Sequence, residues 1–236
     1  MSGFSRTNSV MRNLTVRRLG LMPYGDALEL QRDLVEQRRA GAVGDQLLLV
    51  EHPAVLTLGV RETAGRSHIL ASDTELTARH IDVFETRRGG DVTYHGPGQI
   101  VGYPIIDLNP DRRDVHKYVR DLEDVLMRVA ADYGIHTRRI PGLTGVWAGE
   151  EKLAAIGVRI QRWVTSHGFA LNHTTDLSQF GLIVPCGIPD RGVTSLEQLG
   201  STASRDEVEA RVAAHFAEVF GRVINGASMH PAGSAA

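Results

Sequence analysis

The sequence predicts a mixed α/β fold, of the α+β kind, in which helices pack on a sheet. Three segments show helical periodicity, and several short β-type runs follow one another with no helix between them. A doubly wound fold needs alternating strands and helices, and the chain lacks this alternation. At 236 residues, 42% hydrophobic and 23% charged, the chain suits a single domain with a full core. We expect that domain over residues 14–224, with disordered ends at 1–13 and 225–236.

The first half begins with a short strand and continues with a helix. The helix is expected over 26–39 because apolar residues recur at helical spacing, Asp26 can cap its start and Gly41 follows its end. Residues 46–51 form a short, continuous apolar run, which predicts a buried central strand. The strands expected in this half are 14–19, 46–51, 54–59, 83–87 and 100–108.

Two segments of this half have the composition of loops. Residues 60–79 are mostly polar and irregular, and we expect a mobile loop over a site. Residues 88–99 carry four glycines and a proline around a short β-prone run. This composition lets the backbone approach a ligand closely, but it is equally typical of a glycine-rich hairpin. The segment matches neither common glycine-rich phosphate-binding motif, so nucleotide binding has little support.

The second half has two further helices. Residues 114–133 have one apolar face, which a core-facing helix explains without any ligand. The last helix begins at Ser204, whose hydroxyl and Glu207 have the spacing of a capping box. The strands expected between these helices are 145–148, 152–160 and 164–172.

Charge and composition exclude several classes of function. A net charge of −2 argues against binding nucleic acid by bulk attraction. No apolar run reaches the roughly 20 residues of a membrane helix, and the first dozen residues lack the apolar core of a secretory signal. One cysteine permits no internal disulfide, which fits a reducing compartment. We therefore expect a cytoplasmic protein that binds neither nucleic acid nor a membrane.

The single cysteine, Cys186, lies between Pro185 and Gly187, a pair that indicates a shaped turn rather than a strand interior. A free cysteine is most often a small buried apolar residue. Held on a turn, its sulfur can instead act as a nucleophile. It then needs a partner that lowers its pKa from about 8.5, because only the thiolate attacks.

Lysine is rare in this chain. Of 26 basic residues, all but Lys117 and Lys152 are arginines. Lys117 lies on the polar side of a helix. Lys152 starts an apolar strand beside Glu150 and Glu151, and a solvated ion pair is the ordinary interpretation. If strand pairing is regular, Lys152 shares a face with Ala154 and Ile156, and a pocket on that face would lower the pKa of the ammonium group and let it accept a proton.

Three histidines compete with Lys152 as the partner of the thiol, because a Cys/His pair is the more familiar arrangement. For each of them a structural hydrogen bond is the ordinary interpretation. A metal site has the least support, because the chain has one cysteine and no close ligand pair such as HxxxH. The three histidines are His95, His167 and His173.

Four motifs in sequence order make the chain resemble the lipoyl(octanoyl) transferases. They are RGGDVTYHGPGQIVGYP at 88–104, KLAAIG at 152–157, HGFALN at 167–172 and PCG at 185–187. The resemblance extends from about Leu49 to Leu196. It implies a fold similar to the catalytic domains of biotin and lipoate protein ligases. It also implies that Cys186 takes an octanoyl or lipoyl group as a thioester, and that Lys152 rather than a histidine is its partner.

The resemblance further implies the substrates and the binding site. The donor would be octanoyl-acyl carrier protein, and the acceptors lipoyl domains of 2-oxoacid dehydrogenase complexes and the glycine cleavage H protein, as the first step of endogenous protein lipoylation. No cofactor or metal is expected, because a thioester is already activated. Arg159 and Arg162 are candidates for docking an acidic carrier or are solvated charges. The residues implied to line the acyl site are Arg88, Gly89, Gly90, Asp91, Val92, Thr93, Tyr94, His95, Ala155, Ile156, Gly157, Gly168, Phe169 and Ala170.

Small residues in that set are expected to leave room for an acyl chain beside the backbone. Two other functions remain possible on the residues alone. An ATP-dependent lipoate or biotin-type ligase would share the fold but would form an adenylate. A module that only binds acyl carrier protein would need no nucleophile.

Overall fold

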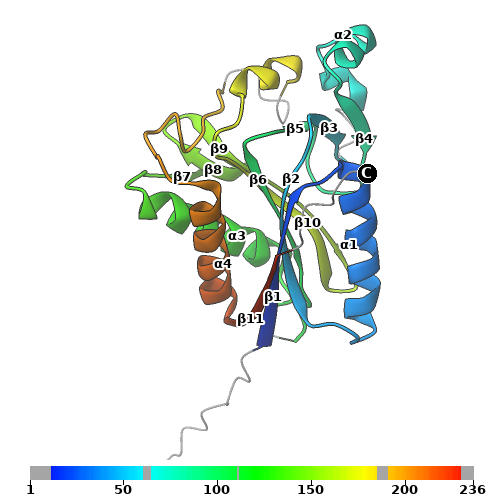
Figure 1. Ribbon diagram of the computed structural model, residues 1–236, viewed down its shortest axis with the longest axis vertical. Helices are drawn as coiled ribbons and strands as arrows, with labels where there is room; N and C mark the ends of the chain where they lie inside the picture. The colour runs from blue at the N-terminus through cyan, green and yellow to red at the C-terminus, as the bar shows by residue number, and fades with distance from the viewer. Residues whose placement is uncertain (1–11, 61–64, 111, 185–190, 230–236) are drawn as a thin grey trace, which may run out of the picture.

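The computed structural model describes residues 12–60, 65–110, 112–184 and 191–229. They form one large mixed sheet with helices on both faces and a small second sheet at one end (Figure 1). In spatial order the large sheet consists of β11 (Arg222–Met229), β1 (Arg12–Leu21), β2 (Asp45–Glu51), β6 (Gln99–Ile105), β10 (Val164–Asn172), β9 (Glu151–Gln161), β8 (Leu143–Ala148) and β7 (Arg138–Ile140).

The large sheet has a parallel part at one edge and an antiparallel part across the rest. β1 pairs in parallel with both β11 and β2, and every later neighbour pair from β2 to β7 is antiparallel. The small sheet has β3 (Val55–Leu58) in the middle, parallel to β4 (Asp82–Glu85) and antiparallel to β5 (Thr93–His95). This arrangement confirms the predicted mixed α/β class.

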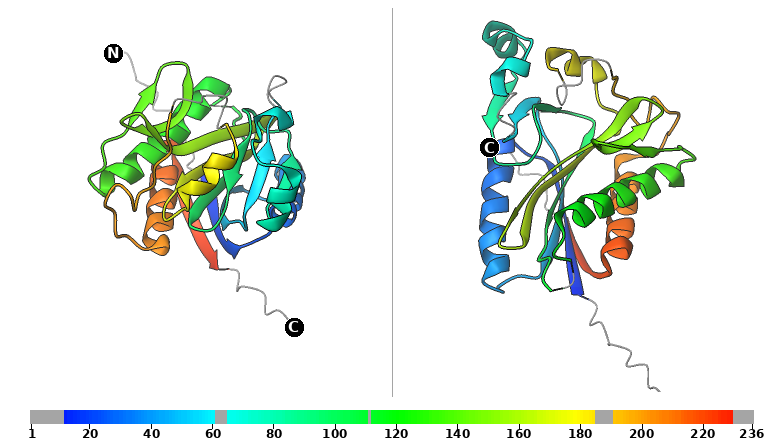
Figure 2. Two further views of the ribbon diagram at one scale, coloured as in Figure 1. Left: turned by 90° about the horizontal axis from the view of Figure 1, so that it is seen from above. Right: turned by 180° about the vertical axis from the view of Figure 1, so that it is seen from behind.

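Helices cover the two faces of the large sheet unequally. α1 (Tyr24–Arg39) lies on one face, and α3 (Val115–Asp132) and α4 (Arg205–Phe220) lie on the other (Figure 2). The small sheet packs with α2 (Asp73–Ala78) and the 3-10 helix η2 (Leu177–Leu182), while a second 3-10 turn, η1, spans Gly65–His68.

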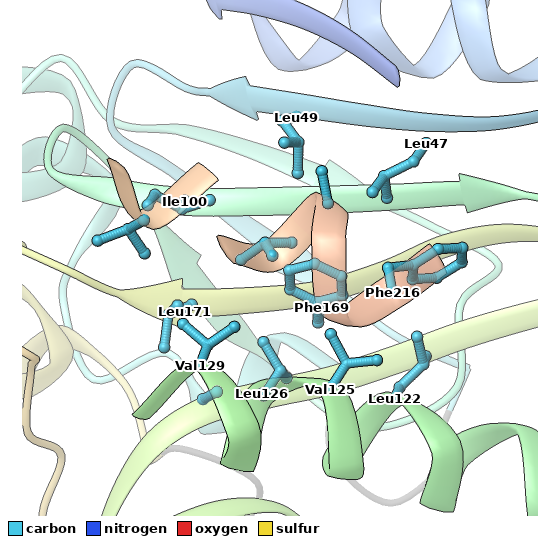
Figure 3. Packing of buried hydrophobic residues seen from close by; sticks show 14 of the residues in the cluster. Leu47, Leu49, Ile100, Leu122, Val125, Leu126, Val129, Phe169, Leu171 and Phe216 are labelled. Carbon is cyan, nitrogen blue, oxygen red and sulfur yellow. The ribbon is translucent and has the colours of Figure 1, made fainter. Parts of the chain in front are cut away.

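The largest core lies between the sheet and the α3–α4 pair. Leu122, Val125, Leu126 and Val129 of α3 point toward the sheet, where Phe169 of β10 meets them (Figure 3). These α3 residues are fully buried, as the predicted apolar face requires. Asp114 caps α3 by accepting from the Lys117 N–H at 2.9 Å, and Ser204 and Glu207 form the predicted capping box of α4.

Several boundaries differ from the prediction. α1 begins at Tyr24 after Pro23 and has no side-chain cap, so Asp26 lies in its first turn, where a carboxylate favours the helix dipole. The described part of the segment expected to be a loop over 60–79 contains η1 and α2. The signal for α2 was Ser72 followed by Glu75, whose backbone N–H donates to the Ser72 hydroxyl at 3.2 Å.

Two further corrections concern strands. The glycine-rich segment is not a hairpin with its neighbours, because β4 and β5 both pair with β3 and β6 belongs to the large sheet. Residues 225–229, expected in a disordered tail, continue β11, which pairs with β1 through Met229. Hydrogen bonds from a strand distant in sequence order this segment, and local composition does not reveal them.

Strands β6 and β10 approach each other unusually closely at two glycines. A Cβ on Gly102 would lie 2.1 Å from the ring of Phe169, its cross-strand partner, and a Cβ on Gly168 would lie 2.1 Å from the Gly102 carbonyl oxygen. The backbone oxygen cannot move aside as a flexible side chain can. Gly168 is therefore required by strand packing.

We predict that Gly168→Ala lowers the free energy of unfolding by about 1–3 kcal/mol, because the added methyl group forces β6 and β10 apart. Urea denaturation of the two proteins measures the difference. Gly181→Ala is the matched control, since a Cβ there would meet no atom of the described residues within 4 Å. Equal stability of the Gly168 variant and the wild type would contradict the packing argument.

Candidate active site

A cavity of about 340 Å³ lies where the glycine-rich segment crosses the large sheet. Its walls come from residues 88–93 and 95, strands β6, β9 and β10, Tyr24 of α1, the first turns of α3, and residues 142–144 at the start of β8. We call it the acyl-site cavity. The sequence-predicted residues that line it are Arg88, Gly89, Gly90, Asp91, Val92, Thr93, His95, Lys152, Ala155, Ile156, Gly157, Gly168, Phe169 and Ala170.

Among the predicted residues that the structure describes, only Tyr94 is not in that lining. Tyr94 points away, because alternate side chains of β5 face opposite sides, and its ring packs against Phe180 at 5.5 Å between centroids. The prediction that Tyr94 lines the site is therefore wrong. Cys186, with Pro185 and Gly187, lies outside the described residues.

Lys152 is buried at one edge of the acyl-site cavity. Its side chain lies over Trp147, with Nζ 4.7 Å from the ring centroid, and the residue is 8% exposed. It is therefore not the solvated strand-end lysine of the ordinary interpretation. Pairing is also irregular there. Val146 of β8 pairs with Ala154 of β9, but the next residue, Trp147, pairs with Lys152, so β9 has one extra residue at this point. The side chains of Lys152 and Ala154 therefore lie on opposite faces of the sheet.

The backbone of Lys152 holds the segment that follows Cys186. Its N–H donates to the Gly192 carbonyl at 2.9 Å, and its carbonyl accepts from the Thr194 N–H at 3.1 Å. On the other side of the 185–190 segment, the Val184 N–H donates to the His68 carbonyl at 2.8 Å. The described residues on both sides of positions 185–190 are therefore hydrogen-bonded to residues at or near the acyl-site cavity.

His68 connects this anchor to the glycine-rich segment. His68 Nδ1 lies 2.7 Å from Asp91 Oδ2, and the other carboxylate oxygen of Asp91 accepts from the Val92 N–H at 2.6 Å. Asp91 is buried and each of its carboxylate oxygens has a partner, so it orders the wall of the cavity.

A chain of buried polar groups leads from His95 to Lys152. His95 Nδ1 donates to Gln99 Oε1 at 2.7 Å, and Gln99 Nε2 donates to Asn172 Oδ1 at 3.0 Å. Asn172 Nδ2 donates to the Thr194 carbonyl at 2.9 Å, and the Thr194 N–H reaches the Lys152 carbonyl. Each buried donor meets an acceptor, which fixes the relative position of the two sides of the cavity.

Arg88 shapes the glycine-rich segment from inside. Its guanidinium donates to the carbonyls of Thr57, Gly89 and Asp91 at 2.6, 3.0 and 2.7 Å. These bonds join β3 to the segment that crosses the large sheet.

The glycine at 157 has a role other than the one predicted. A Cβ there would lie 2.8 Å from the Gly89 carbonyl oxygen and 3.2 Å from the Arg88 side chain. The space beside Gly157 is occupied by the protein itself, so the expectation that this glycine leaves room for an acyl chain is wrong. Its absent side chain lets the Gly89 N–H reach the Val158 carbonyl at 2.9 Å.

Sequence reasoning missed several residues of the cavity wall. Val115 was expected in the core but is 46% exposed at the start of α3, where it lines the acyl-site cavity. No local signal distinguishes it from the core residues on the same helical face. The other lining residues that were not predicted as site residues are Tyr24, Val101, Tyr103, Val119, Gly142, Leu143, Thr144 and Val158, whereas His167, which also lines the cavity, was named as a candidate base.

Comparison with known proteins places this fold and site in a family. A family model described as the lipoyl protein ligase A/B catalytic domain matches residues 23–217. An octanoyltransferase of Solibacter usitatus is 54% identical over 220 residues, which cover 93% of this chain and 99% of the relative. The chain belongs to the octanoyltransferase family.

Solved structures related to this octanoyltransferase-family chain show the same fold. Lipoate-protein ligase A, crystallised with ATP, has a TM-score of 0.74 and 16% identity, over 92% of this chain and 89% of that one. A bipartite lipoate protein ligase from Thermoplasma acidophilum has a TM-score of 0.69 and 16% identity, over 93% and 88%. The predicted similarity to lipoate ligases is confirmed for the fold.

Across the described ranges of this octanoyltransferase-family chain, no group of three or more His, Cys, Asp or Glu side chains is arranged to hold a metal ion. None of the helices in those ranges is long and apolar enough to cross a membrane.

Three buried histidines are neutral at or beside the acyl-site cavity: His95 and His167 line it, and His52 contacts the lining residue Tyr103. Burial lowers the pKa of His95 to about 3 and the pKa of His52 and His167 to about 4. His52 Nδ1 donates to the Met22 carbonyl at 2.8 Å, and its Nε2 accepts from the Tyr103 hydroxyl at 2.8 Å. His173, the third candidate base, lies elsewhere and bonds the Ala203 carbonyl at 2.8 Å.

These histidines should make the octanoyltransferase-family chain sensitive to acid. Between pH 6.5 and about 4 the unfolded chain binds more protons than the folded chain, because unfolded histidine has a pKa of about 6.5. The free energy of unfolding is therefore highest above pH 6.5 and falls as pH falls through this window.

We predict that His52→Gln reduces the slope of unfolding free energy against pH by up to about 1.4 kcal/mol per pH unit. Urea denaturation between pH 7 and 4.5 measures the slope. His116→Gln, on the exposed side of α3, is the control. An unchanged slope in the His52 variant would show that His52 does not stay neutral in the folded protein.

Proposed function

We propose that this chain moves an octanoyl or lipoyl group from acyl carrier protein, through a thioester on Cys186, to a lysine of lipoyl domains. Membership of the octanoyltransferase family supports this reaction. The observation that carries the proposal is the buried Lys152 at the acyl-site cavity, hydrogen-bonded to the residues that follow the Cys186 segment.

The cavity supports an apolar substrate. Its volume of about 340 Å³ lies within the range of small-molecule pockets, about 300–1,000 Å³. Valine, leucine, isoleucine and phenylalanine side chains form much of its wall, and Lys152 and the glycine-rich segment contribute charged and polar groups to it. This division suits an acyl chain whose thioester end lies among the polar groups.

The proposed reaction has two acyl transfers. The Cys186 thiolate attacks the carrier thioester, and backbone N–H groups near the glycine-rich turns stabilise the oxyanion. The carrier thiolate leaves and takes up a proton. The amine of the acceptor lysine then attacks the Cys186 thioester, Lys152 accepts the amine proton, and the Cys186 thiolate is released. Both steps exchange one acyl bond for another, so neither ATP nor a metal is needed.

The proposed substrates are those that the resemblance to the lipoyl(octanoyl) transferases implies. The donor is octanoyl-acyl carrier protein, and the acceptors are the lipoyl domains of 2-oxoacid dehydrogenase complexes and the glycine cleavage H protein. These partners support a cytoplasmic location for the reaction.

We predict that wild-type protein mixed with octanoyl-acyl carrier protein, without ATP, gains the mass of one octanoyl group, and that Cys186→Ser does not. Intact-protein mass spectrometry measures the adduct. An adduct on the serine variant would identify another nucleophile. Product that forms only after ATP is added, with no adduct on either protein, would assign an ATP-dependent ligase instead.

We predict that Lys152→Arg lowers the rate of octanoyl transfer to a lipoyl domain by about 100-fold or more, because arginine keeps the charge but cannot accept the proton. The chain offers a matched control in its other lysine, Lys117, which pairs with Asp121 on the exposed side of α3 at 2.9 Å. Lys117→Arg should retain the wild-type rate. Full activity of Lys152→Arg would remove Lys152 from the mechanism.

A further inference from the structure

A second cavity, of about 480 Å³, lies between α1 and the β9–β10 hairpin. We call it the arginine cavity, because four guanidinium side chains line it. Two carboxylates, Glu36 and Glu85, belong to the same lining. The four arginines are Arg32 and Arg39 of α1, Arg87 after β4 and Arg159 of β9.

The arginine cavity has more positive charge than its carboxylates neutralise. Arg39 pairs with Glu36 at 2.5 Å. The side chains of Arg32 and Arg87 form no hydrogen bond or ion pair with any other residue in the described ranges. Burial and repulsion by Arg87, Arg39 and Arg32 lower the pKa of Arg159. An anion among these side chains would relieve that repulsion.

A buried amide adds an unused donor to the arginine cavity. Gln31 is 2% exposed and lines this cavity. Its Oε1 accepts from the His167 N–H at 2.8 Å, which identifies the other amide atom as the NH₂ donor. That nitrogen has no hydrogen-bond partner within the described part of the chain, and neither has Nε of Arg39. A buried donor without a partner is costly unless a ligand or water supplies an acceptor.

The arginine cavity is next to the acyl-site cavity. His167 lines both cavities. Arg87 lines the arginine cavity and its neighbour in sequence, Arg88, lines the acyl-site cavity. In the same way, Arg159 lines the arginine cavity and Val158 lines the acyl-site cavity. A ligand with an acyl thioester at one end and an anion further along its length would match this arrangement.

We propose that the arginine cavity binds the phosphate group of the pantetheine arm that presents the thioester donor. The inference rests on the proposed function, because it is the acyl thioester that brings such an arm to the site. Arginine fits a phosphate through paired N–H donors, and a concave site with several converging donors suits a single compact anion better than a broad acidic protein surface.

The test compares binding of two non-reactive thioether ligands, S-octyl-pantetheine and its 4′-phosphate, by titration calorimetry. Wild-type protein should bind the phosphorylated ligand about 10-fold or more tightly than the unphosphorylated one. Arg32→Gln and Arg87→Gln should each reduce this preference to about 3-fold or less, with little change for S-octyl-pantetheine. Both side chains lie at exposed positions, so the variants should fold, and thermal melts check this.

Arg211→Gln, an exposed arginine of α4 on the opposite face of the sheet, is the control and should keep the full preference (Figure 2). Equal wild-type affinity for the two ligands would overturn the phosphate site. An equal loss of affinity for both ligands in the variants would also overturn it, because it would indicate distortion of the acyl-site cavity. If the variants weaken binding of intact carrier protein but not of the phosphorylated small ligand, the arginines contact the acidic surface of the carrier protein instead, and the phosphate site is overturned. Because binding needs no turnover, the result stands apart from the octanoyl-adduct test of the proposed function.

Discussion

The contact between the glycine-rich segment and strand β9 is the constraint on which the active site depends. The Gly89 N–H bonds the Val158 carbonyl at 2.9 Å, and this approach is possible because residue 157 has no side chain. Arg88 holds the same segment to β3 through backbone carbonyls. The small sheet is thereby fixed across the end of the large sheet, and the acyl-site cavity is the space enclosed between them.

Buried polar groups then align the two sides of that cavity. The bonds from His95 through Gln99 and Asn172 reach Thr194, which is bonded to the Lys152 backbone. Neutral histidines suit this role, since a charged imidazole in the same place would carry a large desolvation cost. The four arginines of the arginine cavity lie around the second cavity, while Arg88 is buried in the wall of the first. The two cavities are adjacent and share His167 in their walls.

Sequence reasoning predicted the fold class, the three long helices and most strands, because each depends on local periodicity or capping. The apolar face of residues 122–129 and the Ser204 capping box were both present in the structure. It failed where distant segments decide the outcome. Val115 lies on the same helical face as core residues but lines the acyl-site cavity, and residues 225–229 are a strand because β1 pairs with them.

The sequence by itself determined the family and the set of residues expected at the site, since several motifs in a fixed order are specific whatever their spatial arrangement. Only the tertiary structure decided what each residue does there. Register turned Tyr94 away from the cavity and moved Lys152 off the face of Ala154. Gly157 accommodates a backbone rather than a ligand, and arginines from three separate elements converge on one cavity. Strand register and close packing are long-range properties, and motif spacing does not encode them.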